Sequence, residues 1–234
     1  HSAGYVLSAL VDFSAAEQSE IQSGINMWQS ATQVRFVPRA NEPDYVVFAR
    51  SSKGCATARG RQGGAQTVGC ALGDGFGSGS IAHEIGHALG FIHEHQRPGR
   101  DAVVAVSDTA VSAQPNDFAK LPDELTVGHY DCDSIMHYPA EFEYIAAIDS
   151  ACSMMGQRTH ISEGDIFTVN TMYMELPLSS PVFARNQDGR LELFATDRRG
   201  TVRHRWQVEP NSYFDLWNSM SGSVSELSAS RNLD

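Results

Sequence analysis

Residues 83–93 have the residue types and the spacing of a metal site. His83 and His87 stand four residues apart and therefore share one face of a helix. His93 follows six residues later, with Gly90 between, which completes the pattern H-E-x-x-H-x-x-G-x-x-H. A third ligand on the same face would lie too far along the axis, so the chain must turn back at the glycine, where a positive φ is accessible. Three neutral imidazoles suit Zn²⁺ and leave one position for water.

Glu84 directly follows the first ligand, and is therefore rotated to a place beside the metal rather than on it. From there it can take a proton from a water whose pKa the metal lowers to about 7, and can deliver that proton to the leaving amine of a peptide. The alternative is an amphipathic core helix with surface histidines. The apolar positions Ile81, Ile85 and Leu89 show only that the helix packs, and a chance match to the full pattern is on the order of one in fifteen thousand.

A second segment, residues 134–138, reads SIMHY and lies well beyond the zinc motif. Met136 would be a soft, well-packed floor beneath three imidazoles. Taken alone, a methionine flanked by apolar residues is usually core, and Tyr138 would be interpreted as a buried aromatic. With the long motif upstream, the segment supports the same metal site.

Residues 83–97 (HEIGHALGFIHEHQR), together with SIMHY, resemble the astacin family of zinc endopeptidases, within the metzincin group. Supporting matches are scattered over residues 13–173. The resemblance implies an α+β fold in which the active-site cleft runs between two subdomains. It implies Zn²⁺ as the cofactor, Glu84 as general base and Tyr138 as a further ligand that swings away to hydrogen-bond the oxyanion, a role that suits a phenol. The implied zinc ligands are His83, His87 and His93.

The four cysteines are an even number with no C-x-x-C pair, which favours two disulfides and an oxidising, extracellular compartment. The resemblance implies that Cys55 pairs with Cys70 across the loop that borders the cleft. The family's other long disulfide is absent, since Gln33 stands where its first cysteine is expected. Cys132 and Cys152 are left over, and we expect them to pair with each other.

Substrate preference is less well defined. Family members often favour an acidic residue just after the scissile bond, and Arg59 and Arg61 in the Gly-rich segment 51–64 are candidates to bind it. The alternative, a solvated loop with two arginines for solubility, is slightly favoured. The chain has 28 acidic and 17 basic residues, a net charge of −11, with Glu141 and Glu143 just past SIMHY. This acidity opposes acidic substrates and argues against a nucleic-acid partner.

The chain departs from the family's pattern at two places. Gly99 occupies a position that is usually acidic, and the segment before the first strand is short. In the family, the new N-terminus folds toward the glutamate after the third ligand, here Glu94, and whether His1 reaches it is open. Glu94 could instead be a structural carboxylate paired with Arg97 or Arg100.

The elements that must position these residues can be outlined from periodicity and capping. Strands are expected at residues 5–13, 34–37, 45–49 and 67–72, the last at an edge of the sheet. Ser14 with Glu17 forms a capping box at the start of the first helix. The helix of the zinc motif is expected over residues 80–90. Ser162, with Asp165 at its third position, caps a last helix that ends near residue 174.

We expect three regions: a protease domain over residues 1–176, a linker at 177–181 and a small all-β segment at 182–234. The last segment weakly resembles one repeat of bacterial β-propeller lectins. A sugar-stacking face and an ordinary small sheet are both open for it. The residues considered for such a face are Arg198, Arg203, Arg205, Trp206 and Trp217.

The sequence therefore predicts a secreted zinc endopeptidase that acts on proteins or peptides. No apolar run is long enough to cross a bilayer, and the start at His1 without a leader is expected of a processed or a truncated chain. The alternative is a zinc-holding, non-hydrolytic protein that binds carbohydrate in adhesion. Glu84 argues against that alternative, because binding alone has no use for a base beside the metal.

Overall fold

The computed structural model describes residues 4–7, 10, 12–121, 126–140, 144–173, 182–196, 201–207 and 218–223. The chain divides into two compact units, His1–Tyr173 and Met174–Asp234, and each is described by itself. The predicted linker at residues 177–181 lies outside the described residues, so the predicted domain limits remain a prediction. No described helix is long and apolar enough to span a membrane.

The first helix, α1 (Ala15–Ala31), begins at the capping box that the sequence predicts. The Ser14 side chain accepts a hydrogen bond from the backbone N–H of Glu17, and the Glu17 carboxylate accepts one at 2.8 Å from the backbone N–H of Ser14. The apolar stripe of α1 is buried, and the indole N–H of Trp28 donates at 2.7 Å to the carbonyl of Ala82 on helix α2 (Ser78–Ala88). This bond ties the helix of the zinc motif to its neighbour.

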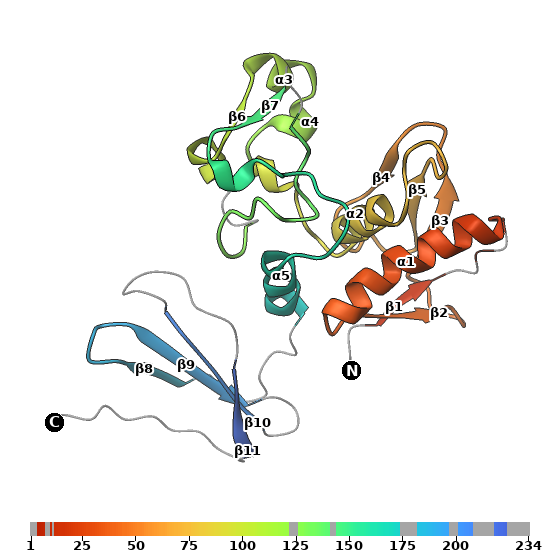
Figure 1. Cartoon of the computed structure of the whole chain (residues 1–234). Helices are drawn as coiled ribbons and strands as arrows, with labels where there is room; N and C mark the ends of the chain where they lie inside the picture. The colour runs from red at the N-terminus through yellow and green to blue at the C-terminus, as the bar shows by residue number, and fades with distance from the viewer. Residues whose placement is uncertain are drawn as a thin grey trace. The chain divides into compact units, whose positions relative to one another are not determined.

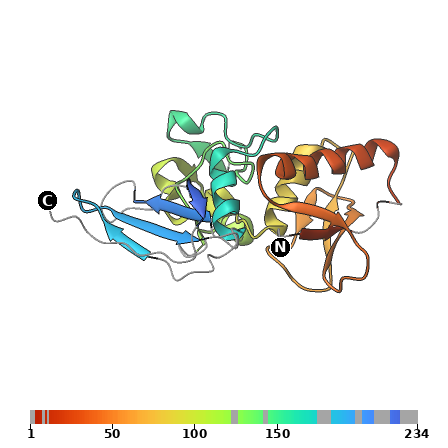
Figure 2. The ribbon, with the colours of Figure 1, turned by 90° about the horizontal axis from the view of Figure 1, so that it is seen from below.

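A five-stranded sheet packs against these two helices. The strand order is β2-β1-β3-β5-β4, with β4 antiparallel to β5 and the other neighbours parallel. The strands are β1 (Gly4–Leu7), β2 (Arg35–Pro38), β3 (Tyr45–Arg50), β4 (Cys55–Thr57) and β5 (Ala65–Cys70). Val46, Phe48 and Val68 share a buried core with the helices, and α1 lies along the sheet in Figures 1 and 2.

The prediction of an edge strand at residues 67–72 is wrong. Strand β5 lies inside the sheet, and β4, in the segment expected to be loop, forms the edge. Cys55 stands opposite Cys70 in the register of this pair, so the short strand is held in place across the sheet. Strand β4 has only three residues, in a Gly- and Ser-rich segment, so the sequence shows no alternating pattern from which the strand could be predicted. The first strand is also shorter than predicted, because Asp12 and Phe13 form the turn before α1.

Helix α2 begins two residues earlier than predicted and ends in a tight reversal. Gly90 has φ +106°, and its N–H donates to the carbonyl of His87 at 2.8 Å. The next residue, Phe91, donates at 3.0 Å to the carbonyl of Gly86. The chain thereby turns back along the helix, as the spacing of the three histidines requires.

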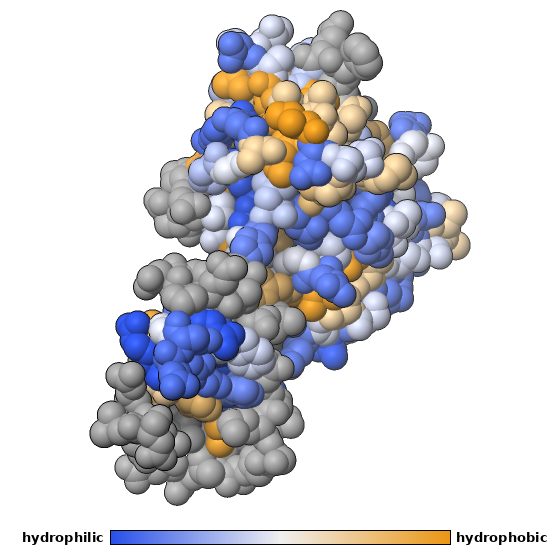
Figure 3. Space-filling model, turned by 60° about the vertical axis from the view of Figure 1, so that its left-hand side comes forward, coloured by the Kyte–Doolittle hydropathy of each residue, from blue (hydrophilic) through white to orange (hydrophobic). Residues whose placement is uncertain are grey.

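The described part of the first unit that follows Gly90 consists mostly of short elements. They are η1 (Glu94–Gln96), η2 (Pro98–Ala102), β6 (Val104–Val106), α3 (Asp108–Ala113), α4 (Pro115–Phe118), β7 (Ile145–Ala147), η4 (Ser150–Cys152) and α5 (Glu163–Tyr173). Strands β6 and β7 pair antiparallel over a small core of their own. The described surface in Figure 3 is mostly hydrophilic, with a hydrophobic patch near the top. Ile148 and Met154 are 60% and 82% exposed in this part of the chain.

Helix α5 begins with the second predicted capping box, which also holds the SIMHY segment. The Asp165 N–H donates to the Ser162 hydroxyl at 3.0 Å, and the Ser162 N–H donates to the Asp165 carboxylate at 3.1 Å. The same buried carboxylate accepts from the Ser134 hydroxyl at 2.6 Å and from the Ile135 N–H at 2.9 Å. One carboxylate therefore joins a helix start to the turn beneath the metal motif.

The second unit is a four-stranded antiparallel sheet, as the predicted all-β segment requires. Its order is β11-β10-β9-β8, formed by β8 (Val182–Arg185), β9 (Leu191–Thr196), β10 (Thr201–Trp206) and β11 (Asn218–Ser223). The sequence predicts the first three at residues 182–185, 191–196 and 202–207, within one residue of their observed bounds. The fourth, Asn218–Ser223, is rich in serine and carries no apolar alternation, so the sequence analysis missed it.

The residues considered for a sugar-stacking face do not share one face of this sheet. Side chains alternate along a strand, so Arg203 and Arg205 lie on the face opposite Trp206. The Trp206 ring packs beside His204, with centroids 5.3 Å apart, and His204 stacks on Phe194. Arg198 and Trp217 lie outside the described residues. Carbohydrate binding by this unit therefore finds no support.

Candidate active site

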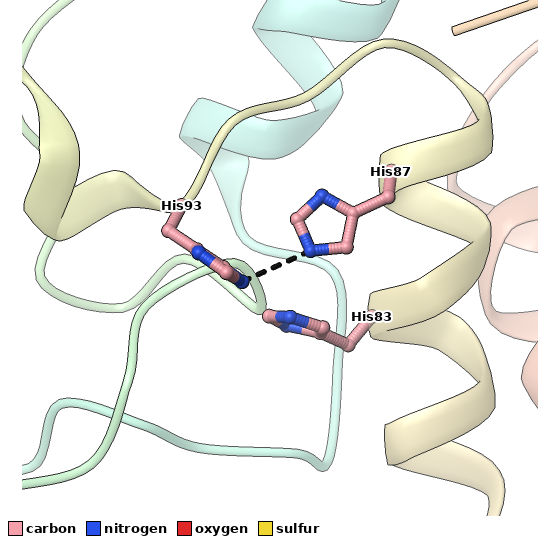
Figure 4. Close-up of side chains that lie close together, drawn as sticks. All are labelled: His83, His87 and His93. Carbon is pink, nitrogen blue, oxygen red and sulfur yellow. Dashed lines mark hydrogen bonds between the residues drawn. The ribbon is translucent and has the colours of Figure 1, made fainter. Parts of the chain in front are cut away.

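The three histidines of the zinc motif converge on one point. Figure 4 shows His83 and His87 one turn apart on α2, with His93 reaching toward them from the returning chain. One ligand atom from each ring lies within 4.8 Å of the others, and the Nε2 atoms of His87 and His93 are 3.0 Å apart. Two nitrogens bound to one tetrahedral Zn²⁺ are about 3.3 Å apart. The spacing of the rings therefore fits that metal.

Carbonyl groups behind the rings select the nitrogen that faces the metal position. The Nδ1 atom of His83 lies 2.8 Å from the Ile135 carbonyl, and Nδ1 of His87 lies 3.0 Å from the Phe91 carbonyl. A carbonyl only accepts hydrogen bonds, so each Nδ1 carries the proton and each Nε2 keeps its lone pair for a cation. The carbonyl that follows the turn at Gly90 thus orients His87, and a carbonyl of the SIMHY segment orients His83.

The histidines are held neutral, which is the form that binds metal. Burial lowers the pKa of His83 and of His93 well below the usual range, and the neighbouring imidazoles lower it further. Burial also lowers the pKa of His87, although the Phe91 carbonyl and the carboxylate of Asp117 partly oppose the shift.

Glu84 lies in the same cavity with an unused acceptor. Its side chain is buried, and its Oε2 has no hydrogen-bond partner among the described residues. Burial raises the pKa of Glu84 to about 8, against the opposing charge of Arg158. An unpaired buried acceptor costs about 1–3 kcal/mol.

Met136 lies directly beneath the helix that carries two of the ligands. It is fully buried, and a Cβ added at Gly86 would overlap its sulfur and lie 3.3 Å from the Trp28 ring. Only glycine at this position lets the methionine approach the helix backbone. Its role as the floor of the site remains a prediction.

Tyr138 lines the cavity beside the third histidine. Its ring centroid is 4.4 Å from that of His93 and 4.5 Å from that of His95, and Phe118 packs edge-on at 5.8 Å. His95 is wholly buried, and its Nε2 donates at 2.8 Å to the carbonyl of Asp117. The tyrosine is thus held by a cluster of rings at the edge of the metal position, and sequence reasoning did not single out His95.

The cavity has a volume of about 450 Å³ and is formed by both parts of the first unit. Residues from β4, α2 and the turn before α2 form one wall, and His93, Asp117, Tyr138, Pro139 and Arg158 form the other. The sequence analysis did not single out Arg158 as a residue of the site. Its guanidinium donates to the carbonyls of His137 at 3.0 Å and Gln157 at 2.8 Å.

The two arginines predicted to bind substrate do not line this cavity. Arg61 forms an ion pair with Asp44, with its Nε 3.0 Å from the carboxylate. Arg59 lies in the same loop and is likewise absent from the cavity wall. Arg158 is the arginine that lines the cavity, although the pKa of His87 is lowered by burial and also by the charge of Arg59, which reaches it.

The structure contains both expected disulfides, Cys55–Cys70 between β4 and β5 and Cys132–Cys152 beside the SIMHY segment. Glu94 contacts Arg97 rather than Arg100: its Oε1 lies 3.4 Å from the Arg97 Nε and accepts the Asp131 N–H at 2.7 Å. The N-terminal residue, whose approach to Glu94 was open, lies outside the described residues.

An α+β unit with three converging imidazoles above a buried methionine defines a metal-binding fold of the metzincin type, and comparison with known proteins gives the family. The model of the astacin peptidase family matches residues 4–174. Bone morphogenetic protein 1 of Xenopus laevis is 34% identical over 186 residues, covering 72% of this chain and 26% of that protein. High choriolytic enzyme 1 of Oryzias latipes is 33% identical over 177 residues, covering 72% of this chain and 64% of that protein.

Solved structures agree. That of high choriolytic enzyme 1, described as a hatching enzyme zinc-protease, has a TM-score of 0.63 and 30% identity, covering 73% of this chain and 88% of that one. Myroilysin shares the fold, with a TM-score of 0.56, 20% identity and coverage of 75% of this chain and 94% of that one.

The chain belongs to the astacin family of zinc metalloendopeptidases, and Zn²⁺ is the cofactor that its three histidines fit. The predicted fold class is thereby confirmed. The chain spans less than two thirds of the length of the two curated relatives named.

Proposed function

We propose that this protein is a zinc-dependent endopeptidase that hydrolyses internal peptide bonds of proteins or peptides. The observation that carries the proposal is the unpaired Oε2 of Glu84, buried in the same cavity as His83, His87 and His93. When bound, Zn²⁺ would supply a Lewis acid that acidifies water and polarises the scissile carbonyl. Binding alone would not need a buried carboxylate with a free acceptor beside the three rings, so hydrolysis is favoured over the adhesion alternative.

Glu84 is the proton carrier of the proposed reaction. Its carboxylate can hold the attacking water and take a proton from it, and it gives that proton to the amine nitrogen as the C–N bond breaks. Because burial raises its pKa, the Glu84 carboxylate is a stronger base for the first of these transfers. Tyr138 lies at the cavity wall, where its hydroxyl can donate to the negative oxygen of the tetrahedral intermediate.

The edge of the sheet supports a peptide as the substrate. Residues Gly54, Cys55, Ala56 and Thr57 line the cavity, and β4 is the edge strand of its sheet. An extended peptide can pair with the backbone groups of such an edge, which holds the scissile bond beside the metal position. If an acidic substrate side chain is bound in the cavity, Arg158 is better placed for it than Arg59 or Arg61.

We also propose that the protein works in an oxidising, extracellular compartment. Two disulfides, Cys55–Cys70 and Cys132–Cys152, support this location, because thiols stay reduced in the cytosol.

The test compares casein hydrolysis by the zinc-loaded wild type with that by Glu84→Gln. Glu163→Gln, an exposed change at the start of α5, is the matched control. We expect Glu84→Gln to keep its zinc and lose at least about a thousandfold in activity, while Glu163→Gln stays within about twofold. Hydrolysis that survives Glu84→Gln, or that resists 1,10-phenanthroline, would contradict the proposal.

A further inference from the structure

We propose that Asp117 is a specificity-determining residue that binds a cationic side chain, lysine or arginine, of the peptide substrate. The inference rests on the proposed endopeptidase function and assigns part of its substrate class. Asp117 lies on α4 and lines the same cavity as the metal-binding His87 and His93. Its side chain is half-buried, so a ligand that reaches it leaves bulk water.

The segment that carries Asp117 is fixed by buried side chains. The Nε2 of His95 donates at 2.8 Å to the Asp117 carbonyl, and the side-chain N–H of Gln96 donates at 2.8 Å to the Asn116 carbonyl. The buried guanidinium of Arg100 bonds the carbonyl of Phe118. The backbone carbonyls of residues 116–118 are therefore all hydrogen-bonded to buried side chains. These bonds fix the backbone from which the Asp117 carboxylate projects. Such preorganisation lowers the entropy lost when a ligand binds.

The Asp117 carboxylate is not used to hold the fold together. Among the described residues, no hydrogen bond or ion pair reaches its side chain; its bonds are made by its backbone N–H and carbonyl. The other charged groups of the cavity wall already have a structural or a proposed catalytic role. Arg158 donates to two carbonyls, and Glu84 lies where the proposed reaction needs a base.

A cationic side chain is the ligand that suits this carboxylate. A protonated amine or guanidinium donates charge-assisted hydrogen bonds, which are about twice as strong as neutral ones. The chain's net charge of −11 acts in the same direction, because a negative field concentrates cationic peptides at the surface. Arg158 lines the same cavity from a different segment and repels a cation. The two groups together therefore restrict a basic residue to positions that face α4.

The test uses peptides that differ at a single position. In one neutral parent peptide, each of the three residues on either side of the scissile bond is replaced in turn by lysine, glutamine or glutamate, and kcat/KM is measured. Wild type is compared with Asp117→Asn and Asp117→Lys. Asp108→Asn, an exposed carboxylate on α3, is the matched control for the change in net charge.

We expect wild type to prefer lysine over glutamine by about tenfold at one of these positions, since a charge-assisted hydrogen bond is worth about one such factor. Asp117→Asn should bring the lysine-to-glutamine ratio of kcat/KM to about one, a ratio in which any change of rate common to both peptides cancels. Asp108→Asn should keep the preference for lysine. Asp117→Lys should reverse it in favour of glutamate, a gain that misfolding cannot produce.

The inference would be overturned if wild type showed no preference for lysine at any position. It would also be overturned if Asp117→Asn kept the preference of wild type, or if Asp108→Asn reduced the preference as much as Asp117→Asn does. Cleavage of the neutral parent peptide by wild type shows that the endopeptidase is active, so a failed Asp117 inference can be told apart from a failed proposal of endopeptidase function. A wild type that cleaves no peptide refutes the endopeptidase itself, whereas unselective cleavage removes the subsite alone.

Discussion

Replacement of Gly79 by alanine should damage the site through the backbone alone. Gly79 lies in the first turn of α2, and a Cβ there would overlap the carbonyl oxygen of Arg158 and lie 2.6 Å from its carbonyl carbon, where real Cβ atoms stay beyond 3.0 Å. The carbonyl oxygen has to withdraw by about 1 Å. Because it belongs to the backbone, no side-chain rotation can relieve the overlap.

The expected cost follows from two opposing effects. Overpacking of this kind costs about 1–3 kcal/mol, and alanine in a helix recovers about 0.5–1 kcal/mol relative to glycine. The net loss is up to about 2.5 kcal/mol of unfolding free energy, equivalent to a fall in Tm of up to about 10 °C for a unit of this size. The same displacement moves Arg158 at the cavity wall. Since a misplacement of about 1 Å can cost a hundredfold in rate, we expect kcat/KM to fall at least about tenfold.

The assay measures Tm and kcat/KM of the zinc-loaded wild type, Gly79→Ala and Gly99→Ala. At Gly99 a Cβ would meet nothing within 4 Å and φ is not positive, so this variant is the matched control and should stay near wild type in both. A Gly79→Ala protein with the Tm of wild type or higher, and with unchanged kcat/KM, would refute the close approach of α2 to the Arg158 backbone.

Three other predictions concern separate features. Tyr138→Phe should keep one zinc per chain and lower kcat about a hundredfold or more with little change in KM; equal kcat would remove the oxyanion role. Thiol titration of the unfolded, unreduced protein should find no free thiols, and two would contradict the Cys132–Cys152 pair. The Arg50 guanidinium and the Ser14 cap lower the pKa of Glu17 from 4.5 to about 2. This pair therefore stabilises the fold above pH 4.5, and that contribution is lost as the pH falls toward 2. In urea titrations of the metal-free proteins, Glu17→Gln should lose less stability than wild type over that interval; parallel curves would show that the pair contributes nothing.

The features that the sequence predicted well are those fixed by local spacing. The two capping boxes predicted the starts of α1 and α5, because their partners lie within three residues. The reversal at Gly90 and the approach of the three rings follow from helix periodicity and one positive φ. In the second unit, apolar runs between turn residues located β8, β9 and β10.

The features that the sequence did not reveal depend on contacts between distant segments. The edge strand β4 exists because Cys55 stands opposite Cys70, and no pattern within three residues shows it. Arg61 is engaged by Asp44, seventeen positions earlier, so it stays away from the cavity. Arg158 reaches the cavity because its segment packs on Gly79, which only the fold brings about.

Zinc K-edge X-ray absorption of the protein loaded with one equivalent of Zn²⁺ tests the central claim most directly. The three converging rings predict a shell with imidazole scattering from three ligands at about 2.0–2.1 Å, and they predict that His87→Ala loses one imidazole and binds the ion more weakly. A sulfur or all-oxygen shell, or a His87→Ala spectrum that matches wild type, would contradict the assignment of His83, His87 and His93 as the metal site.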